Sequence, residues 1–113
     1  MDAHDANSFV AINYITCRPE YATRFEELFK TRAHAIDHAP GFRHMYVLKP
    51  LTAENKYLVI SHWESEQHFK AWTRSAAFLK GHQRGFADLQ AAKAAGKEPP
   101  MQSEFKTYQL LTR

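Results

Sequence analysis

Two side chains in the stretch 64–85 are the ones best suited to chemistry in this chain. His82 offers an imidazole, the commonest side-chain ligand of metal ions, and Trp72 offers a broad apolar wall. His82 follows Phe78 by four residues, so the two share a helical face, and Trp72 lies on the helical segment before them. We therefore predict that Trp72 and His82 leave a helical hairpin toward an apolar interior and form two sides of a pocket.

A third candidate, Asn13, interrupts an otherwise apolar strand. Alternation along residues 8–17 places Asn13 on the same face as Phe9, Ala11 and Ile15. An amide is costly to bury without a partner, and exceptions of this kind concentrate at functional sites. Its amide could donate a hydrogen bond to a small polar ligand in a dry cavity.

Each of these residues also has an ordinary structural interpretation when taken alone. A histidine near a helix end is usually a surface or capping residue, and a tryptophan is usually core. His34 and His38 have the spacing of metal ligands, but they lie opposite the apolar stripe of their segment and have no third ligand in view, so zinc is not favoured. Cys17 lacks an obvious basic partner that would lower the pKa of its thiol.

Composition restricts the class of protein. The 113 residues correspond to one domain, which we place at 8–113 after a flexible tail at 1–7. The net charge of +3 comes from scattered basic residues, which argues against a nucleic-acid partner. A single cysteine, a polar start and no long apolar run predict a soluble, cytoplasmic protein without a membrane segment.

The elements that must position the candidates follow the order β-α-β-β-α-β. We expect strands at 8–17, 42–49, 57–63 and 103–112, and a helix at 20–38. A helical pair should follow the third strand and end near Gly81 and Gly85, because these glycines would break or loosen the second helix. Residues 86–102 should form a mobile connection. The first helix carries an inner stripe in which Arg32 is unusual, because an inward-facing arginine requires an anion. The residues of this stripe are Phe25, Leu28, Phe29, Arg32 and Ile36.

This order predicts an α+β, ferredoxin-like fold: a four-stranded antiparallel sheet with its helices on one face. The other face of the first strand carries Val10, Ile12 and Tyr14. Because such an apolar face would be exposed in a monomer, we expect a homodimer in which two sheets pack face to face.

Four fragments of the chain together resemble the Isd-type haem-degrading monooxygenases. These fragments are AINYI, FKTRAHAIDHAPGF, HWESEQHFKAW and SAAFLKGH. The resembling enzymes belong to the antibiotic-biosynthesis-monooxygenase superfamily of dimeric α/β barrels. The HWES fragment is shared widely and indicates the fold alone, whereas Asn13, Trp72 and His82 together match the Asn/Trp/His set of the haem-degrading family in order and context.

The resemblance implies that haem is both substrate and cofactor, and that the porphyrin is opened at a meso carbon with dioxygen and iron is released. It implies that His82 is the axial iron ligand, that Asn13 hydrogen-bonds the ligand on the open side of the iron, and that Trp72 presses the porphyrin out of plane. Phe29 and Phe78 would form apolar wall, and Arg32 would face a propionate or the distal space. Electrons would come from an external reductase or ascorbate, because no bound flavin is expected.

Other functions remain open at this point. One is a cofactor-independent monooxygenase of the same superfamily that acts on a quinol or a polyketide-like aromatic. Another is a non-catalytic haem-binding carrier or sensor, and a third is a non-catalytic dimeric barrel. A haemin titration with added ascorbate distinguishes them, since each predicts a different fate of the Soret band.

Overall fold

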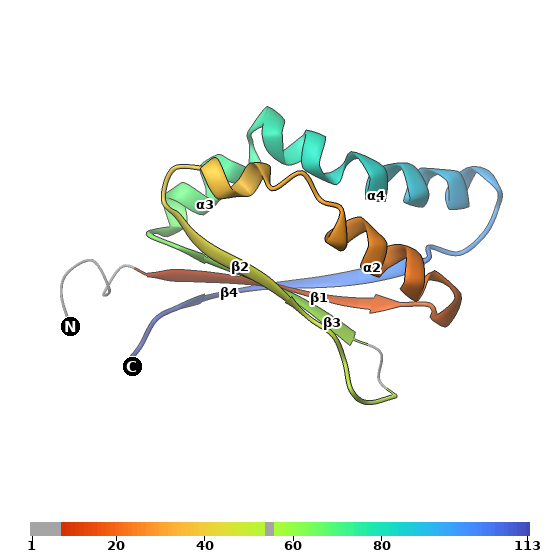
Figure 1. Cartoon of the computed structure of the whole chain (residues 1–113), viewed down its shortest axis with the longest axis horizontal. Coiled ribbons are helices and arrows are strands. Elements are labelled where there is room, and N and C mark those ends of the chain that lie inside the picture. The colour runs from red at the N-terminus through yellow and green to blue at the C-terminus, as the bar shows by residue number, and fades with distance from the viewer. Residues whose placement is uncertain (1–7, 54–55) are drawn as a thin grey trace.

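The computed structural model describes residues 8–53 and 56–113, and their helices all lie on one side of an antiparallel sheet (Figure 1). The four strands are arranged in the order β2-β3-β1-β4, which is the predicted ferredoxin-like plan. The predicted tail at 1–7 lies outside the described residues. In chain order the elements are β1 (Phe9–Cys17), η1 (Pro19–Tyr21), α2 (Ala22–Lys30), η2 (Ala35–His38), β2 (Phe42–Leu48), β3 (Lys56–Trp63), α3 (Glu66–Thr73), α4 (Ala76–Ala94) and β4 (Met101–Gln109).

The central strand β1 has the predicted alternation. Phe9, Ala11, Ile15 and Cys17 are buried on the face that carries the helices, and Asn13 lies on that same face. Antiparallel pairing places Asn13 directly between Val59 of β3 and Phe105 of β4. The middle of the sheet therefore presents an amide to the helical layer.

The helix predicted over 20–38 is wrong in its C-terminal half. It consists of η1 and α2, and α2 ends at Lys30. The Thr31 hydroxyl donates to the carbonyl oxygen of Glu27 at 2.7 Å, and His34 adopts a left-handed conformation with a φ of 60°. The left-handed residue prevents the helix from continuing, so Arg32 lies on a loop rather than on an inner helical stripe.

The helical run predicted from Ala76 is present, but the predicted break at the glycines and the mobile connection at 86–102 are wrong. α4 is one continuous helix over Ala76–Ala94, and it passes through Gly81 and Gly85 without a break. Ser75 begins it, because its hydroxyl accepts a hydrogen bond from the backbone N–H of Phe78 at 3.1 Å. Only the short segment 95–100 connects α4 to β4, which begins two residues earlier than expected.

A glycine fixes the turn that precedes β2. Gly41 has a φ of 78°, and a Cβ at this position would overlap the ring of His68 on α3. Its carbonyl oxygen accepts from the backbone N–H of Glu64 at 2.7 Å. The close approach joins the start of β2 to the start of α3, and so to the helix that carries Trp72.

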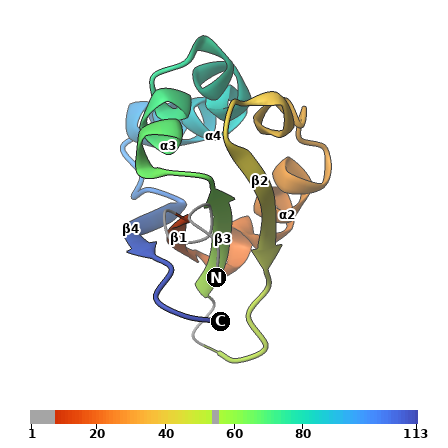
Figure 2. The same cartoon turned by 90° about the vertical axis from the view of Figure 1, so that its left-hand side faces the viewer.

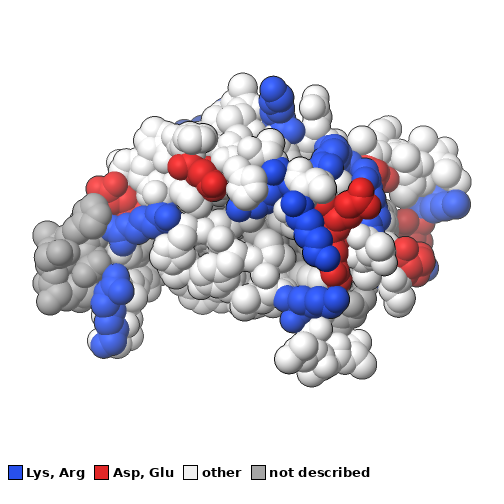
Figure 3. All heavy atoms as spheres, in the orientation of Figure 1, with Lys and Arg blue, Asp and Glu red and all other residues white. Residues whose placement is uncertain are grey.

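The opposite face of the sheet is free of helices (Figure 2). Along it Tyr46, Leu48 and Tyr108 are exposed, and Ile12 and Leu58 are half-buried beside them. A monomer would leave this apolar face in water. On the side of the molecule shown in Figure 3, Lys and Arg side chains are interspersed with Asp and Glu.

Candidate functional site

Asn13 lies between two separate clusters of the core. One cluster contains Phe9, Ala11, Trp63 and Trp72, and the other contains Ile15, Cys17, Phe25 and Tyr57. Ala11 and Ile15, the neighbours of Asn13 on its face of β1, belong to different clusters. The Oδ1 atom of Asn13 is buried and has no hydrogen-bond partner. A buried acceptor in this condition is costly, so the centre of the helical face is polar and unsatisfied.

Trp72, Phe78 and His82 are brought together by α3 and α4. The indole of Trp72 is 8% exposed and meets the ring of Phe78 edge-on, with 5.7 Å between centroids. The Phe78 ring in turn lies 4.1 Å from the ring of His82. Ser65 and Ser75 cap the two helices, which fixes where each of them begins. The predicted helical face shared by Phe78 and His82 is therefore present.

His82 has one ring nitrogen committed and one available. Its Nδ1 lies 2.7 Å from the carbonyl oxygen of Phe78, and because a carbonyl can only accept, Nδ1 carries the proton. A neutral ring with its proton on Nδ1 has its lone pair on Nε2, which is the arrangement seen in metal-binding histidines whose other nitrogen is held by a backbone carbonyl. His82 is exposed, so it does not face an apolar interior as we expected from the sequence.

Phe29 and Arg32 lie apart from this row of rings. Phe29 packs against the second core cluster, with its ring centroid 5.0 Å from that of Phe25. Arg32 is half-buried, and its guanidinium lies 3.9 Å from the carboxylate of Asp37. The anion required by Arg32 is thus supplied, at a long distance, by the chain itself.

Hollows open on the helical side of the sheet in the described part of the chain. One of about 310 Å³ is lined by Phe25, Glu26, Phe29, Lys30, Val47, Lys49 and Tyr57. A larger one of about 510 Å³ lies near the start of α3, between Ser8, Phe9, residues 64–68 and Gln109. Phe29 lines the first hollow, but Asn13, Trp72 and His82 line neither.

Near the C-terminal end of β1, the titratable groups Glu26, Tyr57 and Cys17 have structural roles. The carboxylate of Glu26 accepts from the hydroxyl of Tyr57 at 2.6 Å, and this bond, with Lys49, keeps the pKa of Glu26 below its usual value. Burial, assisted by the charge of Glu26, raises the pKa of the Cys17 thiol to about 11. Such a thiol stays protonated at neutral pH and is unsuited to nucleophilic chemistry.

Metal ligation by a protein cluster is not evident over residues 8–53 and 56–113, where no three His, Cys, Asp or Glu side chains converge. His34, one of the two histidines with metal-ligand spacing, instead pairs with Asp37 at 3.3 Å. In the same part of the chain, no helix has the length and apolar character needed to cross a membrane.

Three residues near the site were missed by the sequence reasoning. The ring of Phe86 stacks on that of His82, with 5.7 Å between centroids, and Arg84 and Asp88 bind α2. Their signal is the spacing of four residues from Phe78 to His82 to Phe86, and again from Arg84 to Asp88. This spacing is meaningful only if residues 76–94 form one continuous helix.

Known proteins similar to this chain include bacterial heme oxygenases. A heme oxygenase (mycobilin-producing) of Mycobacterium tuberculosis is 38% identical over 68 residues, which is 60% of this chain and 65% of the relative, slightly under two thirds of that relative's length. A heme oxygenase (staphylobilin-producing) of Staphylococcus haemolyticus is 35% identical over 77 residues, covering 66% of this chain and 73% of the relative.

A solved structure extends the likeness over nearly the whole chain. The heme degrader MhuD of Mycobacterium tuberculosis, with two hemes bound in its active site, superposes with a TM-score of 0.67 at 28% identity. The superposition covers 93% of this chain and 97% of that one. In addition, residues 8–84 match the model of the antibiotic biosynthesis monooxygenase family, which is more than half of the chain. The chain therefore belongs to the antibiotic biosynthesis monooxygenase family.

Proposed function

We propose that this protein is a haem-degrading monooxygenase that opens the porphyrin at a meso carbon, using dioxygen and external electrons, and releases the iron. The observation that carries the proposal is the similarity to two bacterial heme oxygenases and to a heme degrader whose solved structure holds heme. The chemistry of two site residues, His82 and Asn13, also supports it.

The donor set fits such a group at two points. The Nε2 lone pair of His82 is free, and the ring is held by its Nδ1–H bond to Phe78, as an axial iron ligand requires. The amide of Asn13 has a buried oxygen without a partner, so a bound molecule that supplies a donor would satisfy it. A half-turn of the same amide presents its N–H₂ group instead.

Each residue would then have one task. His82 would hold the iron, whose redox chemistry would supply dioxygen activation. Asn13 would orient a small polar molecule through its buried amide. Trp72, braced by Trp63 at 6.4 Å and by Phe78, would be a rigid apolar wall beside the bound group. Phe29 and Phe78 supply apolar surface, and Arg32 can leave Asp37, 3.9 Å away, for a propionate.

A haemin titration tests the proposal. The wild-type protein should give a stoichiometric Soret band that disappears when ascorbate is added. A persistent band would indicate a haem-binding carrier or sensor, and no band would favour a cofactor-independent oxygenase or a non-catalytic barrel.

Variants assign the roles. His82→Ala should abolish turnover and weaken haem binding, because the axial bond is lost. Asn13→Ala should keep the Soret band and lose most turnover, and Trp72→Phe should slow the reaction and alter the resonance Raman bands that report porphyrin distortion. Gln83→Ala is the matched control, since this exposed neighbour of His82 should leave binding and turnover unchanged. Unchanged turnover in Asn13→Ala would remove this amide from the mechanism.

A homodimer is the second part of the proposal, with the helix-free faces of two sheets in contact. It is supported by the exposed Tyr46, Leu48 and Tyr108 on that face. Leu48→Lys should give monomers in sedimentation experiments at micromolar concentration. Leu79→Lys changes an exposed leucine of α4, on the other side of the sheet, and should leave the dimer intact. A wild-type monomer would contradict this arrangement.

A further inference from the structure

α4 is weakly held by apolar packing, although it carries His82. None of its residues is fully buried, and Ala77 and Phe78, in its first turn, are its contacts with the main core cluster. Two glycines flank His82, and each costs a helix interior about 1 kcal/mol relative to alanine. A Cβ at Gly81 would meet nothing within 4 Å, so packing does not explain the first of them. Something other than burial must therefore hold this part of α4.

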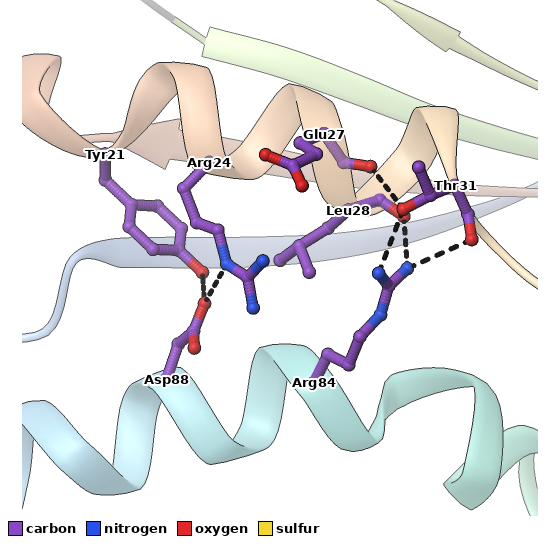
Figure 4. A network of polar contacts seen from close by, with 7 residues as sticks. All are labelled: Tyr21, Arg24, Glu27, Leu28, Thr31, Arg84 and Asp88. Atoms are coloured by element: carbon purple, nitrogen blue, oxygen red, sulfur yellow. Dashed lines mark hydrogen bonds and ion pairs between the residues drawn. The ribbon is translucent and has the colours of Figure 1, made fainter.

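Arg84 provides one attachment, two residues after His82. Its Nη1 donates to Oγ1 of Thr31 at 2.9 Å, and its Nη2 donates to the carbonyl oxygens of Leu28 at 3.0 Å and of Thr31 at 3.2 Å (Figure 4). The two carbonyls belong to the C-terminal turn of α2 and its C-cap, where the helix dipole is negative. A planar guanidinium satisfies all three acceptors at once.

Asp88 provides a second attachment, one turn further along α4. Its carboxylate accepts from the hydroxyl of Tyr21 at 2.6 Å and from Nε of Arg24 at 3.0 Å. Burial alone would raise the pKa of Asp88, but these two hydrogen bonds outweigh it and keep the pKa below its usual value. We refer to the contacts of Arg84 and Asp88 with α2 as the α2–α4 clamp.

His82 lies between the apolar anchor and the clamp. Phe78 attaches α4 on one side of it and Arg84 on the other, so the orientation of the imidazole depends on both. Arg84 also binds the C-terminal turn of α2, which carries Phe29 and is followed in the chain by Arg32. The guanidinium of Arg84 thus connects the helix that carries the proposed iron ligand to the segment that supplies two of the proposed pocket residues.

We propose that Arg84 is a positioning residue that, with Asp88, holds His82 in the orientation required for iron ligation and couples it to the pocket wall on α2. This inference rests on the proposed function, because the role of His82 as iron ligand comes from there.

The imidazole of His82 reports on the clamp without any haem. In the apo protein, the ring protons of His82 lie beside the rings of Phe78 and Phe86, so ring currents should displace their NMR shifts from random-coil values. Arg84→Gln should return these shifts toward random coil and make the amides of residues 81–88 exchange roughly tenfold faster. Asp88→Asn should act in the same direction, and it replaces Arg84→Gln if that variant is too unstable. Gln83→Ala should change neither signal.

The second test measures haemin affinity and the iron–histidine stretching band in the haem complex. Arg84→Gln should weaken haemin binding by about tenfold, as loss of a group that orients a metal ligand does, and should weaken the iron–histidine stretching band. Arg84→Lys keeps the charge but not the planar fork, so it should restore binding only in part. Unchanged His82 shifts in both clamp variants would overturn the inference. An absent Soret band in the wild type would instead refute the proposed function, and the apo shifts would still decide whether the clamp positions His82.

Discussion

Replacing Asn13 by leucine should stabilise the protein while it removes the proposed activity. Leucine branches at the same carbon as asparagine but carries no polar atom. The Oδ1 of Asn13 is buried without a partner, and a buried acceptor in this state costs about 1–3 kcal/mol. Since Oδ1 is the one atom of this side chain found unsatisfied, we expect the lower part of this range, a gain of about 1–2 kcal/mol in the free energy of unfolding. For a domain of this length the melting temperature should rise by roughly 4–8 °C.

Urea unfolding of the apo protein measures the effect, with two comparison variants. Thr16→Val replaces a hydroxyl by a methyl group at an exposed position on the other face of β1, and it reports the effect of a polar-to-apolar exchange without burial. Asn13→Ala also removes the amide but leaves a void, so it should be less stable than Asn13→Leu. If Asn13→Leu is less stable than Asn13→Ala, then either the amide has a hydrogen-bond partner or leucine does not fit in its place. Either result would contradict this prediction.

Three further results are expected. Cys17 should react with a thiol reagent at pH 8 only after unfolding, because it is buried and its pKa is raised to about 11; rapid reaction of the folded protein would show that this end of β1 is open. Burial, followed by the nearby charges of His44 and Arg43, lowers the pKa of His62, so the folded state binds this proton less tightly than the unfolded one. The free energy of unfolding should therefore fall as the pH drops below about 6.5, and His62→Gln should reduce that slope; an equal slope in both proteins would contradict the assignment. Phe25→Ala should cost about 3–5 kcal/mol in urea unfolding, because Phe25 is 2% exposed and packs between Phe29 and Tyr57, and a loss below 1 kcal/mol would contradict this packing.

The strands and their faces could be predicted from the sequence because they depend on local patterns. Alternation along β1 placed Asn13 on the helical face, and the structure confirms this. The end of α2 could not be predicted in the same way. The apolar spacing continues from Phe29 to Ile36, but the carbonyls of the last turn of α2 bind Arg84 from a distant helix. Long-range contacts of this kind leave no mark in the local pattern.

α4 shows the opposite error, in which a local signal was overridden by tertiary contacts. Gly81 and Gly85 favour a break, but the helix continues because Arg84 and Asp88 attach it to α2. The candidate site residues were proposed from residue types, spacing and family resemblance, whereas their surroundings could not be predicted. The tautomer of His82, the row of rings from Trp72 to Phe86 and the pairing of Arg32 with Asp37 all required the structure.

The central claim is that this chain binds haem through His82 and destroys it. The most direct measurement is a haemin titration of the wild type and of His82→Ala, followed by ascorbate under air and mass spectrometry of the pigment. We predict a saturable Soret band in the wild type that decays to a linear tetrapyrrole, and no decay in His82→Ala. Haemin that stays intact in the wild type, or that is degraded equally well by His82→Ala, would contradict the account.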